Sequence, residues 1–143
     1  MNFSELYHLL RQRRAEVPPE SGSARLLSEG LPRILSKLNE ETFEVVLALE
    51  HQSADDVALV VSQAFYYLLC LAVYLEEPFD SLLLAEEAEA LPQDRHELAK
   101  KLCHAAALLC HTPCLGTLNA MPRLLRQALR LAGATERNMF DYL

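Results

Sequence analysis

Hydrophobic positions recur every three or four residues along most of the chain, which is the period of an amphipathic α-helix. Prolines, glycines and short polar stretches interrupt this period and mark the ends of the predicted helices. The predicted helices cover residues 3–14, 23–30, 32–51, 57–75, 79–90, 95–111 and 122–133. A loop is predicted over 15–24, and the tail from 134 onward has no clear pattern. The pattern therefore predicts an all-α fold.

Two capping residues indicate where helices begin, and one stripe of residues indicates which face of a helix is buried. Ser53 and Asp94 stand just before helical runs and are suited to accept backbone N–H groups at a helix start. Within 32–51, four residues spaced at helical intervals form the stripe that should face the core. These residues are Leu38, Thr42, Val45 and Leu49.

The helix over 57–75 is apolar apart from Ser62 and Gln63. Its length alone would allow it to cross a membrane. It contains three tyrosines and has no basic flanks, which favours a helix buried in a bundle or in a dimer. We therefore expect no membrane association, and we expect a homodimer because a lone small bundle would leave part of this apolar surface uncovered.

Charge is distributed unevenly over a chain of 143 residues with a net charge of −7. Residues 1–37 have six basic and four acidic side chains, 38–92 have twelve acidic and no basic ones, and 93–143 have seven basic and four acidic ones. The acidic balance argues against a nucleic-acid partner. The acidic middle block is either a solvated surface or a cluster that binds cations.

Four cysteines and the chain start bear on the cellular compartment. The first ten residues, MNFSELYHLL, do not have the pattern of a secretory signal. We therefore expect free thiols and a cytoplasmic location.

Acidic side chains flank the buried stripe of the 32–51 helix. Lys37, Glu41 and Glu44 fall together on one edge of the stripe, while Glu40 points further out. One interpretation is a solvated edge on which Lys37 neutralises Glu41 at the i+4 position. The other is that Glu41 and Glu44, three residues apart, converge on a cation.

The first two thirds of the chain resemble a known family. The segments LYHLLRQRR, PPESGSARLLSEGLPRILSKLNEETFEVVLALE and HQSADDVALVVSQAFYYLLCL are similar to the phosphoribosyl-ATP pyrophosphohydrolases of histidine biosynthesis, which belong to the all-α MazG-like nucleotide pyrophosphohydrolases. The likeness covers about residues 3–85. It implies a MazG-like core over 1–92 and an extension over 93–143 with two extra C-terminal helices.

This resemblance implies Mg²⁺-dependent hydrolysis of phosphoribosyl-ATP to phosphoribosyl-AMP and pyrophosphate, with water attacking between the α and β phosphates. The family's first acidic pair falls on Glu41 and Glu44, and Glu40 beside them is a candidate to orient the water. Its second acidic pair falls on Val60 and Gln63, so half of that metal-binding motif is missing.

The departure leaves two hypotheses open. Mg²⁺ often takes only one or two carboxylates, so Glu41 and Glu44 can still hold one ion with Gln63 as a neutral ligand and Asp56 within reach. The chain is then an enzyme of reduced activity, on phosphoribosyl-ATP or on another nucleoside triphosphate. Alternatively, it is a non-catalytic relative that binds nucleotide or protein.

Basic residues are available for the phosphates in the resembling region. Lys37 lies on the same edge as the glutamates, and Arg13 and Arg25 flank the loop that contains Ser21 and Ser23. These three side chains are candidates to bind phosphate or ribose, with Lys37 the strongest of them; the alternative for each arginine is an ordinary surface role.

The last third offers two further candidates. Cysteines and histidines recur seven residues apart, at Cys103 with Cys110 and at His104 with His111, followed by Cys114; they are either small buried residues or zinc ligands. The stripe Arg123, Arg126 and Arg130 is a solvated face, a phosphate clamp or a dock for the acidic block.

Overall fold

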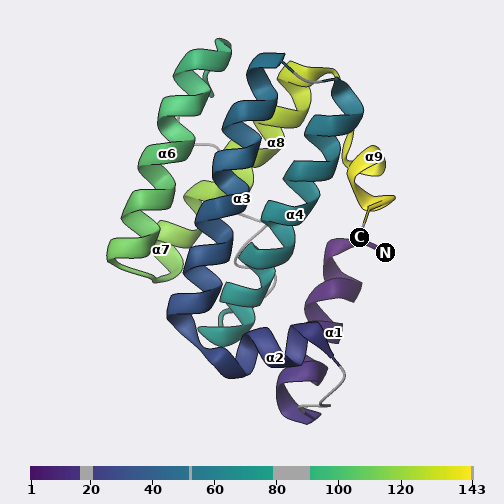
Figure 1. Ribbon diagram of the computed structural model, residues 1–143, viewed down its shortest axis with the longest axis vertical. Coiled ribbons are helices and arrows are strands. Elements are labelled where there is room, and N and C mark those ends of the chain that lie inside the picture. Colours follow the sequence, from purple (N-terminus) through teal and green to yellow (C-terminus); the bar gives the residue numbers. More distant parts are fainter. Residues whose placement is uncertain (17–20, 52, 79–90, 143) are drawn as a thin grey trace.

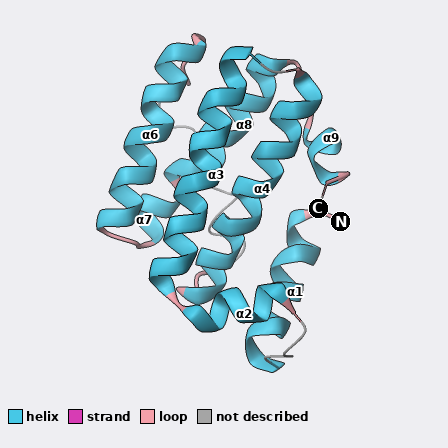
Figure 2. Ribbon diagram, viewed as in Figure 1, coloured by secondary structure: helices cyan, strands magenta, loops and turns pink. Residues whose placement is uncertain are grey.

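The computed structural model describes residues 1–16, 21–51, 53–78 and 91–142, and every regular element in these ranges is a helix (Figures 1 and 2). The all-α prediction is confirmed. The helices are α1 (Phe3–Glu16), α2 (Gly22–Glu29), α3 (Leu31–His51), α4 (Ala54–Tyr74), α6 (Arg95–His111), α7 (Leu115–Leu118), α8 (Ala120–Ala132) and α9 (Glu136–Phe140).

Helix α4 is the centre of the fold, and α1, α3, α8 and α9 all pack against it (Figure 1). By length and composition α4 could cross a membrane, but 67% of its apolar window is buried inside the protein. The interpretation of this segment as a helix buried in a bundle is confirmed. Its neighbour α3 covers it along most of its length.

The predicted stripe of α3 faces this core. Leu38, Thr42, Val45 and Leu49 are each no more than 2% exposed. The Thr42 hydroxyl donates to the Leu38 carbonyl at 2.8 Å, so its polar group is satisfied within the helix. Burial of this stripe fixes the rotation of α3 and leaves its flanking charged residues at the rim of the core.

Capping chemistry sets the helix ends as predicted. The Ser53 hydroxyl accepts the Asp56 N–H at 3.3 Å at the start of α4, and the Asp94 carboxylate accepts the Glu97 N–H at 3.3 Å at the start of α6. At the other end of α8, Gly133 adopts φ 76°, a left-handed conformation in which glycine has no steric penalty.

Several predicted boundaries differ from the structure. Helix α1 extends to Glu16 and α2 begins at Gly22, so much of the predicted loop over 15–24 is helical. Helix α8 begins at Ala120, which places Pro122 in its first turn, where a missing N–H costs little. The short helices α7 and α9 were not predicted, and the helix predicted over 79–90 lies outside the described residues.

The C-terminal helices share one core with the rest of the chain. Leu98, Leu102 and Leu125 belong to the same hydrophobic cluster as the residues of α3 and α4. Arg95 reinforces this packing by donating to the Leu49 carbonyl at 2.6 Å and to the Leu131 carbonyl at 3.0 Å. Instead of two extra helices, the described part of 93–143 contains two long helices and two short ones.

The predicted arginine stripe has a structural role within the C-terminal segment. Arg126 forms an ion pair with Glu136 of α9 at 2.6 Å, and Arg130 donates to Gln127 at 3.1 Å. Of this stripe, Arg126 therefore binds the tail of the chain, and Arg130 binds a neighbour on its own helix.

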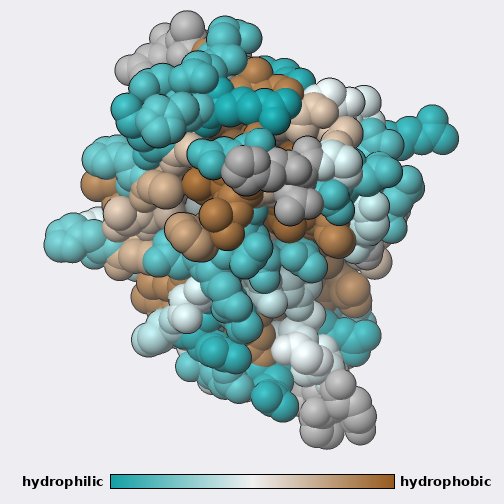
Figure 3. Space-filling view, turned by 45° about the horizontal axis from the view of Figure 1, so that its top comes forward, coloured by the Kyte–Doolittle hydropathy of each residue, from teal (hydrophilic) through white to brown (hydrophobic). Residues whose placement is uncertain are grey.

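Apolar surface also remains exposed, as the brown groups among hydrophilic ones in Figure 3 show. Phe43 and Leu47 lie one turn apart on α3 and are 57% and 49% exposed. Leu59 on α4 and Leu108 on α6 are exposed as well.

The central position of α4 generates a stability prediction. Phe65 is 1% exposed and its ring lies 4.4 Å from that of Phe3. We expect Phe65→Ala to lower the free energy of unfolding by about 3–5 kcal/mol, because it opens a cavity between α1 and α4. The exposed Phe43→Ala should change it by less than about 0.5 kcal/mol. Urea titrations followed by circular dichroism measure both; equal effects would contradict this packing.

Candidate active site

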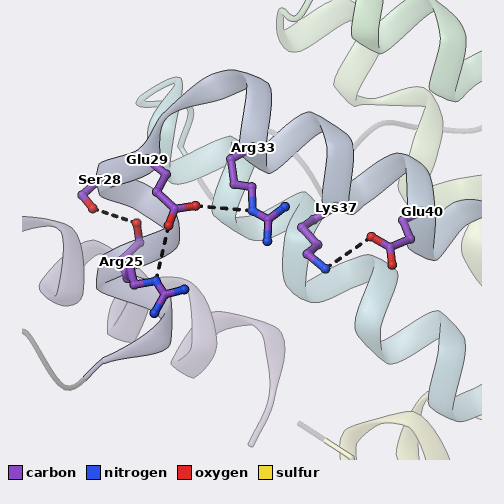
Figure 4. Close-up of polar contacts among 6 residues, drawn as sticks. All are labelled: Arg25, Ser28, Glu29, Arg33, Lys37 and Glu40. Carbon is purple, nitrogen blue, oxygen red and sulfur yellow. Dashed lines mark hydrogen bonds and ion pairs between the residues drawn. The ribbon is translucent and has the colours of Figure 1, made fainter.

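The edge of α3 presents four charged side chains over two turns of helix. Lys37 and Glu41 are half-buried, while Glu40 and Glu44 are exposed. The ammonium of Lys37 lies 3.3 Å from the Glu40 carboxylate (Figure 4). Lys37 thus forms its ion pair with the i+3 residue Glu40. The expected interaction with Glu41 at i+4 is present as an electrostatic attraction, which lowers the pKa of Glu41.

Glu41 is in an environment that disfavours its charge. Burial raises the pKa of the Glu41 carboxyl, and the neighbouring carboxylates of Glu40 and Glu44 raise it further, while Lys37 opposes them. An added cation would relieve both the repulsion and the loss of solvation. The electrostatics of this edge thus favour a positive ligand.

A cavity of about 390 Å³ opens beside Glu41. Its wall comes from α1, α2, α3, α4 and the end of the chain, so it forms only in the folded protein. The lining residues are Met1, Leu6, Leu9, Ser23, Glu41, Ser62, Gln63, Tyr66, Tyr67 and Tyr142. We call it the aromatic cavity. It brings together Glu41 and Gln63, two of the residues predicted to bind metal.

A second cavity, of about 510 Å³, lies between α2, α3 and α4. Three basic side chains line it: Arg25, Arg33 and Lys37. In Figure 4 they extend to the same side of α2 and α3. We call it the basic cavity. It shares Ser23, Tyr66 and Tyr67 with the aromatic cavity, so the two adjoin along a common wall.

Glu29 organises the basic cavity. Its carboxylate pairs with Arg25 at 3.3 Å through one oxygen and with Arg33 at 3.3 Å through the other. Both pairs are largely exposed, so they add little stability. Their effect is to hold two guanidinium groups side by side, each of which has more donors than one carboxylate oxygen uses.

Tyrosines form the wall between the cavities. The Tyr66 hydroxyl is hydrogen-bonded to Ser23, which joins α4 to the start of α2. Burial chiefly raises the pKa of Tyr66 to about 12, so its hydroxyl stays protonated at neutral pH. Burial also raises the pKa of Tyr67, while Lys37 lowers it and Glu41 raises it. Tyr67 therefore lies within the field of both charged groups.

Other predicted site residues lie elsewhere. Asp56 accepts a hydrogen bond from the Ser53 hydroxyl at 2.8 Å and serves at the start of α4. Val60 packs against the core. Arg13 is on α1, and in the described chain it does not line either cavity. Its neighbour Arg14 donates to the Val73 carbonyl at 2.5 Å at the end of α4.

Arg33 and the paired tyrosines are site residues that the sequence analysis missed. Arg33 is one turn before Lys37, so the spacing that placed Lys37 at the edge of α3 also placed Arg33 there. Tyr66 and Tyr67 were considered only as members of an apolar helix. Their polar ends gave the signal that this helix borders a cavity.

The donors of this site fit one divalent cation shared with a phosphate. Mg²⁺ commonly takes one or two protein carboxylates and completes its six oxygens from water and phosphate. Glu41 and Glu44 are such carboxylates, and Gln63 offers a neutral oxygen from α4. Within the described ranges, no group of three or more aspartate, glutamate, histidine or cysteine side chains is placed to hold a metal ion, and this holds for the cysteines and histidines of α6 as well.

Comparison with known proteins identifies relatives of this chain. The family model of phosphoribosyl-ATP pyrophosphohydrolases matches residues 3–103, further than the expected 3–85. A phosphoribosyl-ATP pyrophosphatase of Lactiplantibacillus plantarum is 31% identical over 100 residues, which are 70% of this chain and 83% of the relative. One from Leptospira biflexa is 32% identical over 85 residues, 59% of this chain and 90% of the relative.

A fused relative also matches. The histidine biosynthesis bifunctional protein HisIE of Halalkalibacterium halodurans is 31% identical over 92 residues, 64% of this chain. The match spans only 44% of that longer protein. No solved structure matches the chain significantly.

The electrostatics of α3 generate a titration prediction. Glu44→Gln should lower the pKa of Glu41 by removing a repulsive charge, and Lys37→Met should raise it by removing an attractive one. Carbon-detected NMR titration of labelled glutamate measures both. Because the folded state raises this pKa, the contribution of Glu41 to stability declines as pH rises through the window between its unfolded and folded values. If the pKa of Glu41 is the same in both variants as in the wild type, Glu44 and Lys37 do not lie close to Glu41 as described.

Proposed function

The chain belongs to the phosphoribosyl-ATP pyrophosphohydrolase family, and on this premise we propose that it hydrolyses phosphoribosyl-ATP to phosphoribosyl-AMP and pyrophosphate. The observation that supports this most strongly is the placement of Glu41. This carboxylate has a raised pKa, lines a cavity large enough for a small molecule, and lies one turn from Lys37 in the adjoining basic cavity. The acidic Glu41 and the basic Lys37 are thus placed to bind the metal ion and the phosphates of one polyphosphate ligand.

In this proposal the basic cavity receives the phosphates. Lys37 contributes a point charge, and Arg25 and Arg33 contribute planar donor pairs suited to phosphate oxygens. Glu29 holds the two guanidinium groups in position. These positive charges stabilise the negative charge that the departing pyrophosphate gains in the transition state.

We propose that Glu41 and Glu44 hold a single Mg²⁺ together with phosphate oxygens, with Gln63 as a neutral donor from α4. When bound, the ion would withdraw negative charge from the phosphates and so favour attack by water. Glu40 is the candidate to orient that water. One of its oxygens receives Lys37, and a carboxylate has a second oxygen that can accept a hydrogen bond.

The small number of acidic metal ligands should also limit the rate of hydrolysis. Gln63 and Val60 stand where two acids of the family's motif are expected, so the site has two fewer negative charges for metal. Asp56 does not replace them, because its carboxylate is used at the start of α4. We therefore propose a slow enzyme that binds Mg²⁺ mainly in the presence of nucleotide.

We also propose that the protein works as a homodimer in the cytoplasm. In α4, 67% of the apolar window is buried within its own chain, so the helix leaves only a small apolar surface, at Leu59, for a partner. The support is now the exposed Phe43 and Leu47 on α3, since adjacent large apolar groups mark interfaces. The four free cysteines are compatible with a reducing compartment.

Replacing single glutamates of α3 by glutamine tests the proposed reaction. We expect Glu41→Gln to reduce pyrophosphate release from phosphoribosyl-ATP with Mg²⁺ by about 100-fold, because it removes the charge that places the metal. Glu50→Gln, the same change at the exposed end of α3, should leave release unchanged. Equal release by wild type and Glu41→Gln would overturn the assignment. Binding of phosphoribosyl-ATP without release by the wild type would favour the non-catalytic binding protein.

Charge placed on the outer face of α3 tests the dimer. Phe43→Asp combined with Leu47→Asp should convert a dimer to a monomer, because two charges would then be desolvated at the interface. Sedimentation equilibrium measures the mass. Leu108→Asp, on the exposed face of α6, is the matched control and should leave the dimer intact. A wild-type protein that sediments as a monomer would rule the dimer out.

A further inference from the structure

We propose that a third cavity, between α1 and the C-terminal end of α4, is a binding site for a free α-amino acid with an apolar side chain. We call it the α1–α4 cavity. Its volume is about 710 Å³, which lies within the usual range for small-molecule pockets. The described residues that line it are different from those that line the aromatic and basic cavities. The inference therefore goes beyond the proposed hydrolysis.

Arg14 is held in a fixed position on the wall of this cavity. Its Nη1 donates to the Val73 carbonyl at 2.5 Å and to the Tyr74 carbonyl at 3.0 Å, and its guanidinium lies 5.1 Å from the centre of the Tyr74 ring. A guanidinium has five N–H donors, and these two bonds use only those of one nitrogen. The remaining donors, on Nε and Nη2, have the planar arrangement that binds both oxygens of a carboxylate.

Arg11 adds a second positive charge to the same wall. It is three residues before Arg14, so the two side chains are neighbours on one face of α1, and both line the cavity. Arg11 is exposed to solvent. Like charges at this spacing repel each other, and an anion placed between them relieves the repulsion. This side of the cavity therefore favours a carboxylate.

Glu76 brings a negative charge to the cavity from the end of α4. Its φ of 60° is the left-handed conformation that glycine usually supplies after a helix, and the Glu77 N–H closes the turn by donating to the Ala72 carbonyl at 2.9 Å. Glycine would form this turn with less strain, so the turn itself gives no reason for a glutamate here. A carboxylate that contacts a ligand in the cavity does give one.

One backbone oxygen brings the opposite charges close together. The Val73 carbonyl accepts both the Arg14 Nη1 and the Glu76 N–H, the latter at 3.1 Å. Within the described ranges, neither Arg11 nor Arg14 forms an ion pair with the Glu76 carboxylate. The cavity thus presents donors for an anion and an acceptor for a cation at short range, and these charges are not used on each other.

This pattern of charge favours a zwitterion over a simple ion. Inorganic phosphate would be repelled by Glu76, and a plain amine would be repelled by both arginines. An α-amino acid has its carboxylate and its ammonium on one carbon, and the negative end of the α4 dipole also favours the ammonium. Apolar groups complete the wall and fit an apolar side chain. These are Ala15, Val73 and Pro78.

Three ligands that differ by one charged group test this inference. They are L-phenylalanine, 3-phenylpropionate, which lacks the ammonium, and phenethylamine, which lacks the carboxylate. Each is titrated into the full-length, ¹⁵N-labelled protein, and NMR follows the Nε–H signals of the arginines. We expect the wild type to bind L-phenylalanine about tenfold more tightly than either of the other two, because only L-phenylalanine engages both charges.

Two variants separate the two charges. Arg11→Gln should weaken L-phenylalanine and 3-phenylpropionate about tenfold without weakening phenethylamine. Glu76→Gln should weaken L-phenylalanine and phenethylamine without weakening 3-phenylpropionate. Glu77→Gln is the matched control, because Glu77 does not line the cavity, and it should bind all three like the wild type.

Stability gives an independent readout for Glu76. Glu76→Gly should relieve the left-handed strain and raise Tm by a few degrees, yet bind L-phenylalanine about tenfold more weakly than the wild type. A role confined to the turn would raise Tm and leave binding unchanged.

Three outcomes would overturn the inference. These are no binding of L-phenylalanine by the wild type, binding no tighter than that of the two fragments, and binding that neither Arg11→Gln nor Glu76→Gln weakens. The proposed hydrolysis can fail separately. Glu41→Gln, on the edge of α3, should leave L-phenylalanine binding unchanged, and a wild type that releases no pyrophosphate can still bind the amino acid.

Discussion

Burial of helix α4 is the constraint on which the rest of the structure depends. Twelve of its 21 residues are buried, which is more than one neighbouring helix can cover. Helices α1, α3, α8 and α9 therefore surround it, and segments from both ends of the chain meet on its surface. The stripe of α3 that seals α4 determines where Lys37 and Glu41 stand. The site is thus a consequence of how the core is closed.

The charged edge of α3 is the functional part that we propose, because the fold leaves Glu41 and Lys37 partly desolvated. Burial raises the pKa of Glu41, and the neighbouring carboxylates of Glu40 and Glu44 raise it further. Basic groups stand close by, but Arg25 and Arg33 are directed to Glu29, and Lys37 to Glu40. The metal–phosphate ligand that we propose would neutralise both sets of charges at once. This physical complementarity agrees with the family to which the chain belongs.

Sequence periodicity was sufficient for the long helices but not for the cavities. The α3 stripe, the Ser53 and Asp94 caps and the burial of α4 could be predicted because each depends on residues close in sequence. Helix α9 could not, because its five residues are held by Arg126 and by packing on Phe3, which lie far away in the chain. The juxtaposition of Glu41 with Gln63 was anticipated from the family motif. Tyr142 lines the same cavity as Glu41 and Gln63 because the tail of the chain returns to α1, and no local sequence pattern indicates this return.

The most direct test of this account is a calorimetric titration of Mg²⁺ into the protein, with and without an adenine nucleotide whose bond between the α and β phosphates cannot be hydrolysed. The account predicts weak Mg²⁺ binding to the free protein, much tighter binding when the nucleotide is present, and loss of that enhancement in Glu41→Gln. Mg²⁺ affinity that is the same with and without nucleotide, or that Glu41→Gln does not change, would contradict a shared metal–phosphate site on the edge of α3.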